Sequence, residues 1–165
     1  MCANAADFRK AKMLAFNVLE ANMIIEPPVV AQTIAKTYGL RVDYSLFNEE
    51  YRDEVAGFLD IDEKMIVVNA EDSRQRQNFT VAHELGHFLL EHDVLSPEYT
   101  YLFRHPEKQK NVPMEQEANI FAANLLVPTS FLREYLERYS FATDEQLSRI
   151  FGVSATVIKY RRLYI

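Results

Sequence analysis

Apolar residues recur with helical spacing at the start of the chain. Between about Asp7 and Met23 they lie on one face of a helix, at Phe8, Ala11, Leu14, Ala15, Val18 and Leu19. A break follows at Pro27 and Pro28. A second, shorter helix is expected from residue 29 to residue 38, with Gly39 placed to end it.

The pattern then changes to short, partly β-branched runs. These extend from Arg41 to Leu46, from Val55 to Leu59 and from Lys64 to Asn69. The acidic segment 60–63 separates the last two runs and is expected to form the turn of a hairpin. The three runs together predict a small antiparallel sheet of three strands.

Helical spacing returns after the polar run 71–76. One helix is predicted by apolar side chains at Phe79, Ala82, Leu85, Leu89 and Leu90. Another is predicted from Met114 to Leu126, where Pro128 ends it, and two or three short helices are expected after that. Helices packed with a small sheet indicate an α+β fold.

Composition narrows the class of protein. The chain has 165 residues, 48% hydrophobic and 25% charged, which suits one globular domain with a buried core. A net charge of -6 disfavours attraction to nucleic acid over the whole surface. The chain shows no secretory signal, no apolar run of membrane-spanning length, and a single cysteine, Cys2. We therefore expect a cytoplasmic protein with no membrane association and no disulfide.

The stretch VAHELGHFLL, residues 81–90, places two histidines and a glutamate on an apolar helix. His83 and His87 are four residues apart, so both imidazoles can bind one metal ion from the same helix face. Glu84 is close enough to take a proton from a water that such an ion activates. This pattern is typical of metal-assisted peptide hydrolysis. The alternative is that both histidines are half-buried helix residues that bind no metal.

A catalytic zinc site needs a third protein ligand. Asp93 and His92 are near in sequence, but Leu90 is expected to keep the chain helical, which would carry both away as solvated residues. Glu115 is the better candidate because it lies on the apolar face of the later helix. The alternative for Glu115 is a carboxylate in the first turn of a helix, without a metal.

Neighbours of Glu115 add to this interpretation. Ala118 and Ala122 are small and would let this helix approach the histidine-bearing helix closely. Asn119, one turn after Glu115, is expected to hydrogen-bond a ligand histidine. Glu117 is about 200° around the helix from Glu115 and is expected to be an exposed charge on the opposite side.

These motifs resemble the ImmA/IrrE family of zinc metallopeptidases. The likeness covers most of the chain and rests on GFL at 57–59, IVVN at 66–69, FTVAHELGH at 79–87, EQEAN at 115–119 and FAANLLVP at 121–128. Two positions depart from the family pattern. Asn78 stands where members often have a basic residue, and Glu91 where they often have histidine, which concerns substrate preference more than chemistry.

The resemblance implies a role for each site residue. His83, His87 and Glu115 would bind the metal, Glu84 would act as general base, and Asn119 would support a ligand histidine. The implied ion is zinc, although this ligand set could also hold manganese or iron. It also implies a zincin-like metallopeptidase domain, expected over residues 1–139.

The resemblance further implies a protein substrate, a helix-turn-helix transcriptional repressor of a mobile element or a DNA-damage response. The strand from Lys64 to Asn69 could pair with an extended substrate segment if it lies at the sheet edge; otherwise it is an ordinary hairpin strand.

Tyr101 and His105 could supply an oxyanion donor, or be exposed loop residues. A rival interpretation is a non-enzymatic antirepressor or antitoxin-like partner whose metal site is idle.

Residues 140–165 fit a helix-turn-helix pattern, in which Thr143 and Ser154 are predicted N-caps. We expect these helices to pack on the peptidase domain. They carry a basic end at Lys159, Arg161 and Arg162. Such a small cluster on an acidic chain disfavours direct DNA binding.

Overall fold

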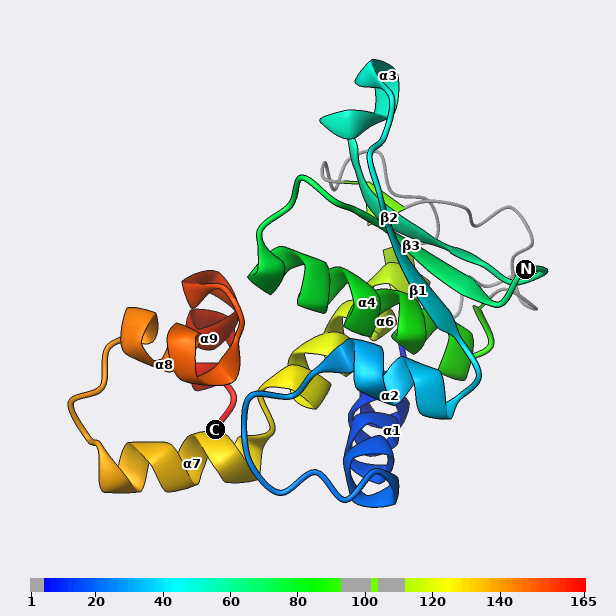
Figure 1. Cartoon of the computed structure of the whole chain (residues 1–165). Coiled ribbons are helices and arrows are strands. Elements are labelled where there is room, and N and C mark those ends of the chain that lie inside the picture. Colours follow the sequence, from blue (N-terminus) through cyan, green and yellow to red (C-terminus); the bar gives the residue numbers. More distant parts are fainter. Residues whose placement is uncertain (1–4, 93–101, 104–111) are drawn as a thin grey trace.

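Helices pack on one side of a small sheet in the computed structural model, which describes residues 5–92, 102–103 and 112–165 (Figure 1). The predicted α+β class is confirmed. Cys2, Asp93, Tyr101 and His105 lie outside the described residues.

Two helices form the N-terminal part, as predicted: α1 (Phe8–Ala21) and α2 (Ala31–Thr37). The side chain of Asp7 caps α1 by accepting a hydrogen bond of 2.9 Å from the amide of Lys10. Gly39 follows α2 with a φ of 80°, a left-handed conformation that ends a helix without steric cost for glycine.

Four strands form the sheet: β1 (Arg41–Ser45), β2 (Val55–Asp60), β3 (Met65–Asn69) and β4 (Leu102–Phe103). Their order is β1-β3-β2-β4. β2 and β3 form the predicted antiparallel hairpin, but β1 pairs with β3 in parallel, and β4 adds a strand next to β2. The prediction of three antiparallel strands was therefore wrong in number and in orientation.

The connections explain the mixed sheet. The chain leaves β1, passes through α3 (Glu49–Arg52) and returns in β2, and the hairpin then inserts β3 between the two. A strand antiparallel to β2 in that position must run parallel to β1. Because β3 has partners on both sides, it offers no free edge to a substrate, and of the two alternatives left open for this strand the ordinary hairpin strand is the one that the structure shows.

Two long helices pack against each other, α4 (Arg74–Leu89) and α6 (Val112–Leu126), and α4 covers the sheet. α4 packs against β2 and β3, and also contacts α2 and α6. Figure 1 shows α4 lying across the sheet, with α1 and α2 farther from it. One apolar core joins these elements and includes Ile66 of β3, Leu85 of α4 and Phe121 of α6.

The end of α4 differs from the prediction. The helix stops at Leu89, Leu90 is its cap, and Glu91 takes a left-handed φ of 60°. Leu90 is buried in the core, and the chain turns sharply after it instead of continuing as a helix. His92 is therefore not carried away from the site.

Three helices complete the chain: α7 (Thr129–Arg138), α8 (Asp144–Phe151) and α9 (Ala155–Arg162). Both predicted caps form, since Thr143 accepts from the amide of Gln146 at 3.2 Å and Ser154 accepts from the amide of Val157 at 3.4 Å. Apolar side chains of α8 and α9 belong to the common core. The division at residue 139 stays a prediction.

The basic end of α9 is only partly at the surface. Arg161 is 2% exposed, so it does not belong to the surface cluster that the sequence suggested.

None of the helices in the described ranges has the length and apolar character needed to cross a membrane.

Candidate metal centre

The structure brings the three predicted ligands together. His83 and His87 come from α4, and Glu115 from the first turn of α6. The Nε2 atoms of the histidines are 3.0 Å apart. They lie 3.3 Å and 3.4 Å from the two carboxylate oxygens of Glu115. One ligand atom from each residue falls within 4.8 Å of the others, and all three residues are buried.

Close contact between α4 and α6 makes this cluster possible. Gly86 lies between the histidines, where a Cβ atom would come within 3.4 Å of the Cα of Ala118 and 2.8 Å of the ring of Phe121. The expected role of Ala118 as a small contact residue is confirmed. Glycine at 86 and alanine at 118 let the two ligand-bearing helices approach closely.

Asn119 contacts the first histidine as predicted. Its Oδ1 lies 3.1 Å from Nδ1 of His83. An amide oxygen only accepts hydrogen bonds, so His83 carries its proton on Nδ1. In the neutral imidazole the lone pair is then on Nε2, which lies 3.3 Å from Oε2 of Glu115, the arrangement that a metal ligand needs.

The second histidine has partners that the sequence analysis missed. Nδ1 of His92 lies 2.8 Å from Nδ1 of His87, and Nε2 of His92 lies 3.0 Å from Oε2 of Glu117. His92 is 1% exposed, so its description as a solvated residue was wrong. Glu117 was likewise wrongly described as an exposed charge, because its side chain is 14% exposed and bonded to His92. The helical-wheel argument for His92 failed because α4 ends before this residue.

Burial and charge separate the pKa values of the two ligand histidines. Burial is the largest influence on His83 and lowers its pKa, but Glu115, Glu84 and Asn119 together outweigh it and raise the pKa above the ordinary value. The pKa of His87 lies well below the ordinary value, because burial and positive charge on His83 and His92 disfavour its protonation. His87 is therefore neutral at neutral pH, the state in which an imidazole binds a metal.

Glu84 is fully buried beside the cluster. Its negative charge is one of the influences that raise the pKa of His83, after burial, which lowers it, and Glu115. The geometry thus combines a possible proton acceptor with three possible ligands. Glu84, the candidate proton acceptor, is adjacent in sequence to His83, one of the candidate ligands, on α4.

The donor set fits a divalent metal ion. Both carboxylate oxygens of Glu115 are buried and accept no hydrogen bond from any residue that the structure describes. Burying an unsatisfied carboxylate is costly, and a cation between it and the two imidazoles would remove that cost. Two histidines and a glutamate also form a known ligand set of catalytic zinc.

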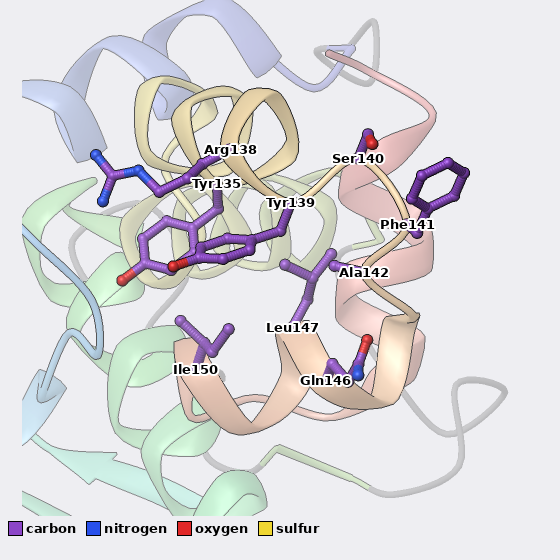
Figure 2. Close-up of a pocket in the computed structure, with 9 residues that line it drawn as sticks. All are labelled: Tyr135, Arg138, Tyr139, Ser140, Phe141, Ala142, Gln146, Leu147 and Ile150. Carbon is purple, nitrogen blue, oxygen red and sulfur yellow. The ribbon is translucent and has the colours of Figure 1, made fainter.

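Two hollows differ in their relation to this site. One of about 650 Å³ is lined by residues of α7, α8 and the segment between them, with no residue from α4 or α6. In Figure 2, Tyr135 and Tyr139 lie on one side of this hollow and Leu147 and Ile150 on the other. The second, of about 490 Å³, includes Asn119 and is lined largely by apolar side chains of α1, α4, α6 and α9.

Comparison with known proteins decides the family. Residues 35–162 match the family model of the IrrE N-terminal-like domain, peptidase family M78. The chain belongs to the ImmA/IrrE family of metallopeptidases. The resemblance drawn from the sequence motifs is therefore confirmed.

Two curated members of the ImmA/IrrE family are similar to the chain. It is 30% identical to the metallopeptidase ImmA of Bacillus subtilis (strain 168) over 128 residues, which cover 78% of this chain and 70% of that protein. It is 34% identical to the radiation response metalloprotease IrrE of Deinococcus radiodurans over 85 residues. That match covers 50% of this chain and 25% of IrrE.

A solved structure shares the fold. The Mycobacterium tuberculosis transcriptional regulator superposes with a TM-score of 0.66 at 19% sequence identity. The match covers 93% of this chain and 46% of that one. The chain therefore spans less than half of the regulator and a quarter of IrrE.

Proposed function

We propose that this protein is a zinc-dependent endopeptidase that cleaves a protein regulator, specifically a helix-turn-helix transcriptional repressor. The observation that carries the proposal is the burial of Glu84 against the cluster of His83, His87 and Glu115. Membership of a metallopeptidase family supports the reaction type. A cytoplasmic location stays a prediction from the sequence.

In the proposed reaction, His83, His87 and Glu115 hold the ion. When bound, zinc acidifies water and polarises the scissile carbonyl. Glu84 takes a proton from the attacking water and passes it to the nitrogen of the departing amine. The hollow that includes Asn119 offers apolar surface next to the site for a substrate side chain.

The test uses a helix-turn-helix repressor encoded beside the gene. The repressor is incubated with the zinc-loaded protein, with the protein after chelation, and with the Glu84→Gln variant, and the products are identified by mass spectrometry. We expect one cut by the zinc-loaded protein. Without its general base, Glu84→Gln should cut about 10²- to 10⁴-fold more slowly while still binding zinc.

Glu137→Gln is the matched control, because it removes the same charge from an exposed residue of α7. It should cleave at the normal rate. Binding of the intact repressor by both the unmodified protein and Glu84→Gln would favour the antirepressor instead. Cleavage that survives in Glu84→Gln at the normal rate would contradict the assigned general base.

A further inference from the structure

A chain of hydrogen bonds leads from Glu117 through His92 to His87. The distances are 3.0 Å from Glu117 Oε2 to His92 Nε2, and 2.8 Å from His92 Nδ1 to His87 Nδ1. Both histidines are buried. The Nε2 atom of His87 at the far end of this chain faces Glu115 at 3.4 Å.

The chemistry of the three groups sets the direction of the chain. An ionised carboxylate only accepts hydrogen bonds, so Nε2 of His92 carries a proton and donates to Glu117. Two N–H groups cannot face each other at 2.8 Å in a hydrogen bond, so one Nδ1 atom must accept. With the proton of His92 on Nε2, its Nδ1 accepts and Nδ1 of His87 donates. The lone pair of His87 Nε2 is then directed toward the space shared with His83 and Glu115.

The rest of the fold holds this chain in place. The left-handed residue Glu91 turns the backbone after α4 and brings His92 back beside His87. The other carboxylate oxygen of Glu117, Oε1, accepts a hydrogen bond of 2.7 Å from the backbone amide of Asp7, at the start of α1. Glu117 is therefore fixed at one oxygen by α1 and uses the other for His92.

We propose that His92 and Glu117 are positioning residues that hold His87 in the tautomer protonated on Nδ1 and keep its Nε2 available to the metal. His92 acts through His87, and Glu117 acts through His92. Asn119 does the same for His83, so each ligand histidine has its own orienting partner. The inference rests on the proposed metal site, but its first test below needs no metal and no substrate.

The decisive variant is Glu117→Gln. The backbone N–H of Asp7 can donate to the carbonyl oxygen of the new glutamine but not to its NH₂ group, and this fixes which of the two faces His92. The glutamine carbonyl oxygen is expected to keep the bond from Asp7, which leaves the amide NH₂ group facing Nε2 of His92. His92 would then have to accept at Nε2 and donate from Nδ1. The whole chain would reverse, and the proton of His87 would move to Nε2, where it blocks metal binding.

The first measurement is the tautomer of His87 in the metal-free protein, read from long-range ¹H–¹⁵N correlation spectra. We expect the Nδ1–H form in the unmodified protein and the Nε2–H form in Glu117→Gln. The second is zinc affinity by competition with a chromophoric chelator. Glu117→Gln should bind zinc about 10- to 100-fold more weakly, the range for partners of metal-ligating histidines.

Glu137→Gln is the matched control for charge, because it removes the same charge from an exposed residue of α7, and it should change neither the tautomer nor the affinity. An unchanged His87 tautomer in Glu117→Gln, with zinc affinity within about threefold of normal, would overturn the inference. Failure of the proposed function looks different. In that case the tautomers still respond as expected, but the unmodified protein binds no zinc or cleaves no repressor.

Variants of His92 separate hydrogen-bond direction from simple packing. A glutamine at position 92 can accept from His87 through its oxygen and donate to Glu117 through its nitrogen, whereas leucine can do neither. We expect His92→Gln to bind zinc much more tightly than His92→Leu and to keep the Nδ1–H form of His87. Equal losses in both variants would show that His92 only fills space.

Discussion

At the scale of single residues, Gly86 lies at the close contact between α4 and α6, the helices that carry His83, His87 and Glu115. A Cβ atom at this position would come within 2.8 Å of Cδ1 of Phe121, a ring that is fully buried and cannot move aside freely. A methyl group added here has two opposite effects on the free energy of unfolding. Alanine favours a helix over glycine by about 0.5–1 kcal/mol, whereas overpacking a core costs about 1–3 kcal/mol.

We predict that Gly86→Ala lowers the free energy of unfolding by about 1 kcal/mol, because the steric cost exceeds the gain in helix propensity. Separation of the helices should also weaken zinc binding, since Glu115 would move away from both histidines. Urea denaturation of the metal-free protein measures the first effect, and chelator competition measures the second.

The control for this prediction is the same substitution in a Phe121→Leu background. The smaller side chain relieves the contact, so Gly86→Ala should cost less there than in the unmodified protein. A Gly86→Ala variant that is as stable as the unmodified protein would contradict the close-contact explanation.

At the scale of elements, Arg161 attaches α9 to the junction between α6 and α7. Its Nε donates to the carbonyl of Val127 at 2.9 Å, and its Nη2 donates to Oγ1 of Thr129 at 2.7 Å. Burial is the main influence on this guanidinium and lowers its pKa. The long side chain thus satisfies a backbone carbonyl left over where α6 ends.

We predict that Arg161→Ala lowers the free energy of unfolding by about 2 kcal/mol or more. The variant loses the packing of the side chain and leaves the Val127 carbonyl without this donor. Thermal or urea denaturation checks the prediction. Lys159→Ala, at an exposed position of the same helix, should be almost neutral. Equal effects of the two variants would contradict the assigned role of Arg161.

The same contacts bear on DNA binding. Arg162 also bonds within the chain, to the carbonyl of Ala142 at 2.9 Å and to Asp144 at 3.2 Å. A loss of DNA binding after substitution of these arginines would therefore reflect damage to the helical pair as readily as loss of a phosphate contact. Lys159 is the informative position for that test.

At the scale of the whole molecule, the cluster links parts of the chain that are far apart in sequence. His83 and His87 lie on α4, Glu115 lies on α6, and Glu117 reaches the start of α1. An ion bound by the folded protein alone stabilises it by mass action, by about 2.7 kcal/mol at a free concentration 100 times the dissociation constant.

We predict that zinc at this concentration raises the melting temperature by about 5–10 °C, given the usual shift of about 2–4 °C per kcal/mol for a domain of this size. Chelation should reverse the shift. Differential scanning calorimetry with and without zinc measures it. The same shift in Glu115→Leu as in the unmodified protein would exclude Glu115 as a ligand, because leucine offers no ligand atom.

Local sequence patterns were sufficient to predict most elements and the core of the site. Apart from the short helix α3, which was not predicted, the helices, the β2–β3 hairpin and the caps at Thr143 and Ser154 depend on side chains only a few residues apart, which is why the pattern predicts them. His83, Glu84 and His87 share one helix for the same reason. Glu115 was predicted because the apolar face of its helix shows which side is buried, and Asn119 because it lies one turn after Glu115.

Only the tertiary structure decided the features that depend on distant partners. The parallel pairing of β1 with β3 follows from insertion of a hairpin between two strands, and β4 joins the sheet from far along the chain. Glu91 turns the chain just after Leu90, which is buried in the core, and His92 then lies against His87 and Glu117. The sequence by itself therefore determined most of the elements and the candidate ligands, because these depend on local periodicity. The partners that orient His87 were decided by packing, because no periodicity relates residues on opposite sides of a turn.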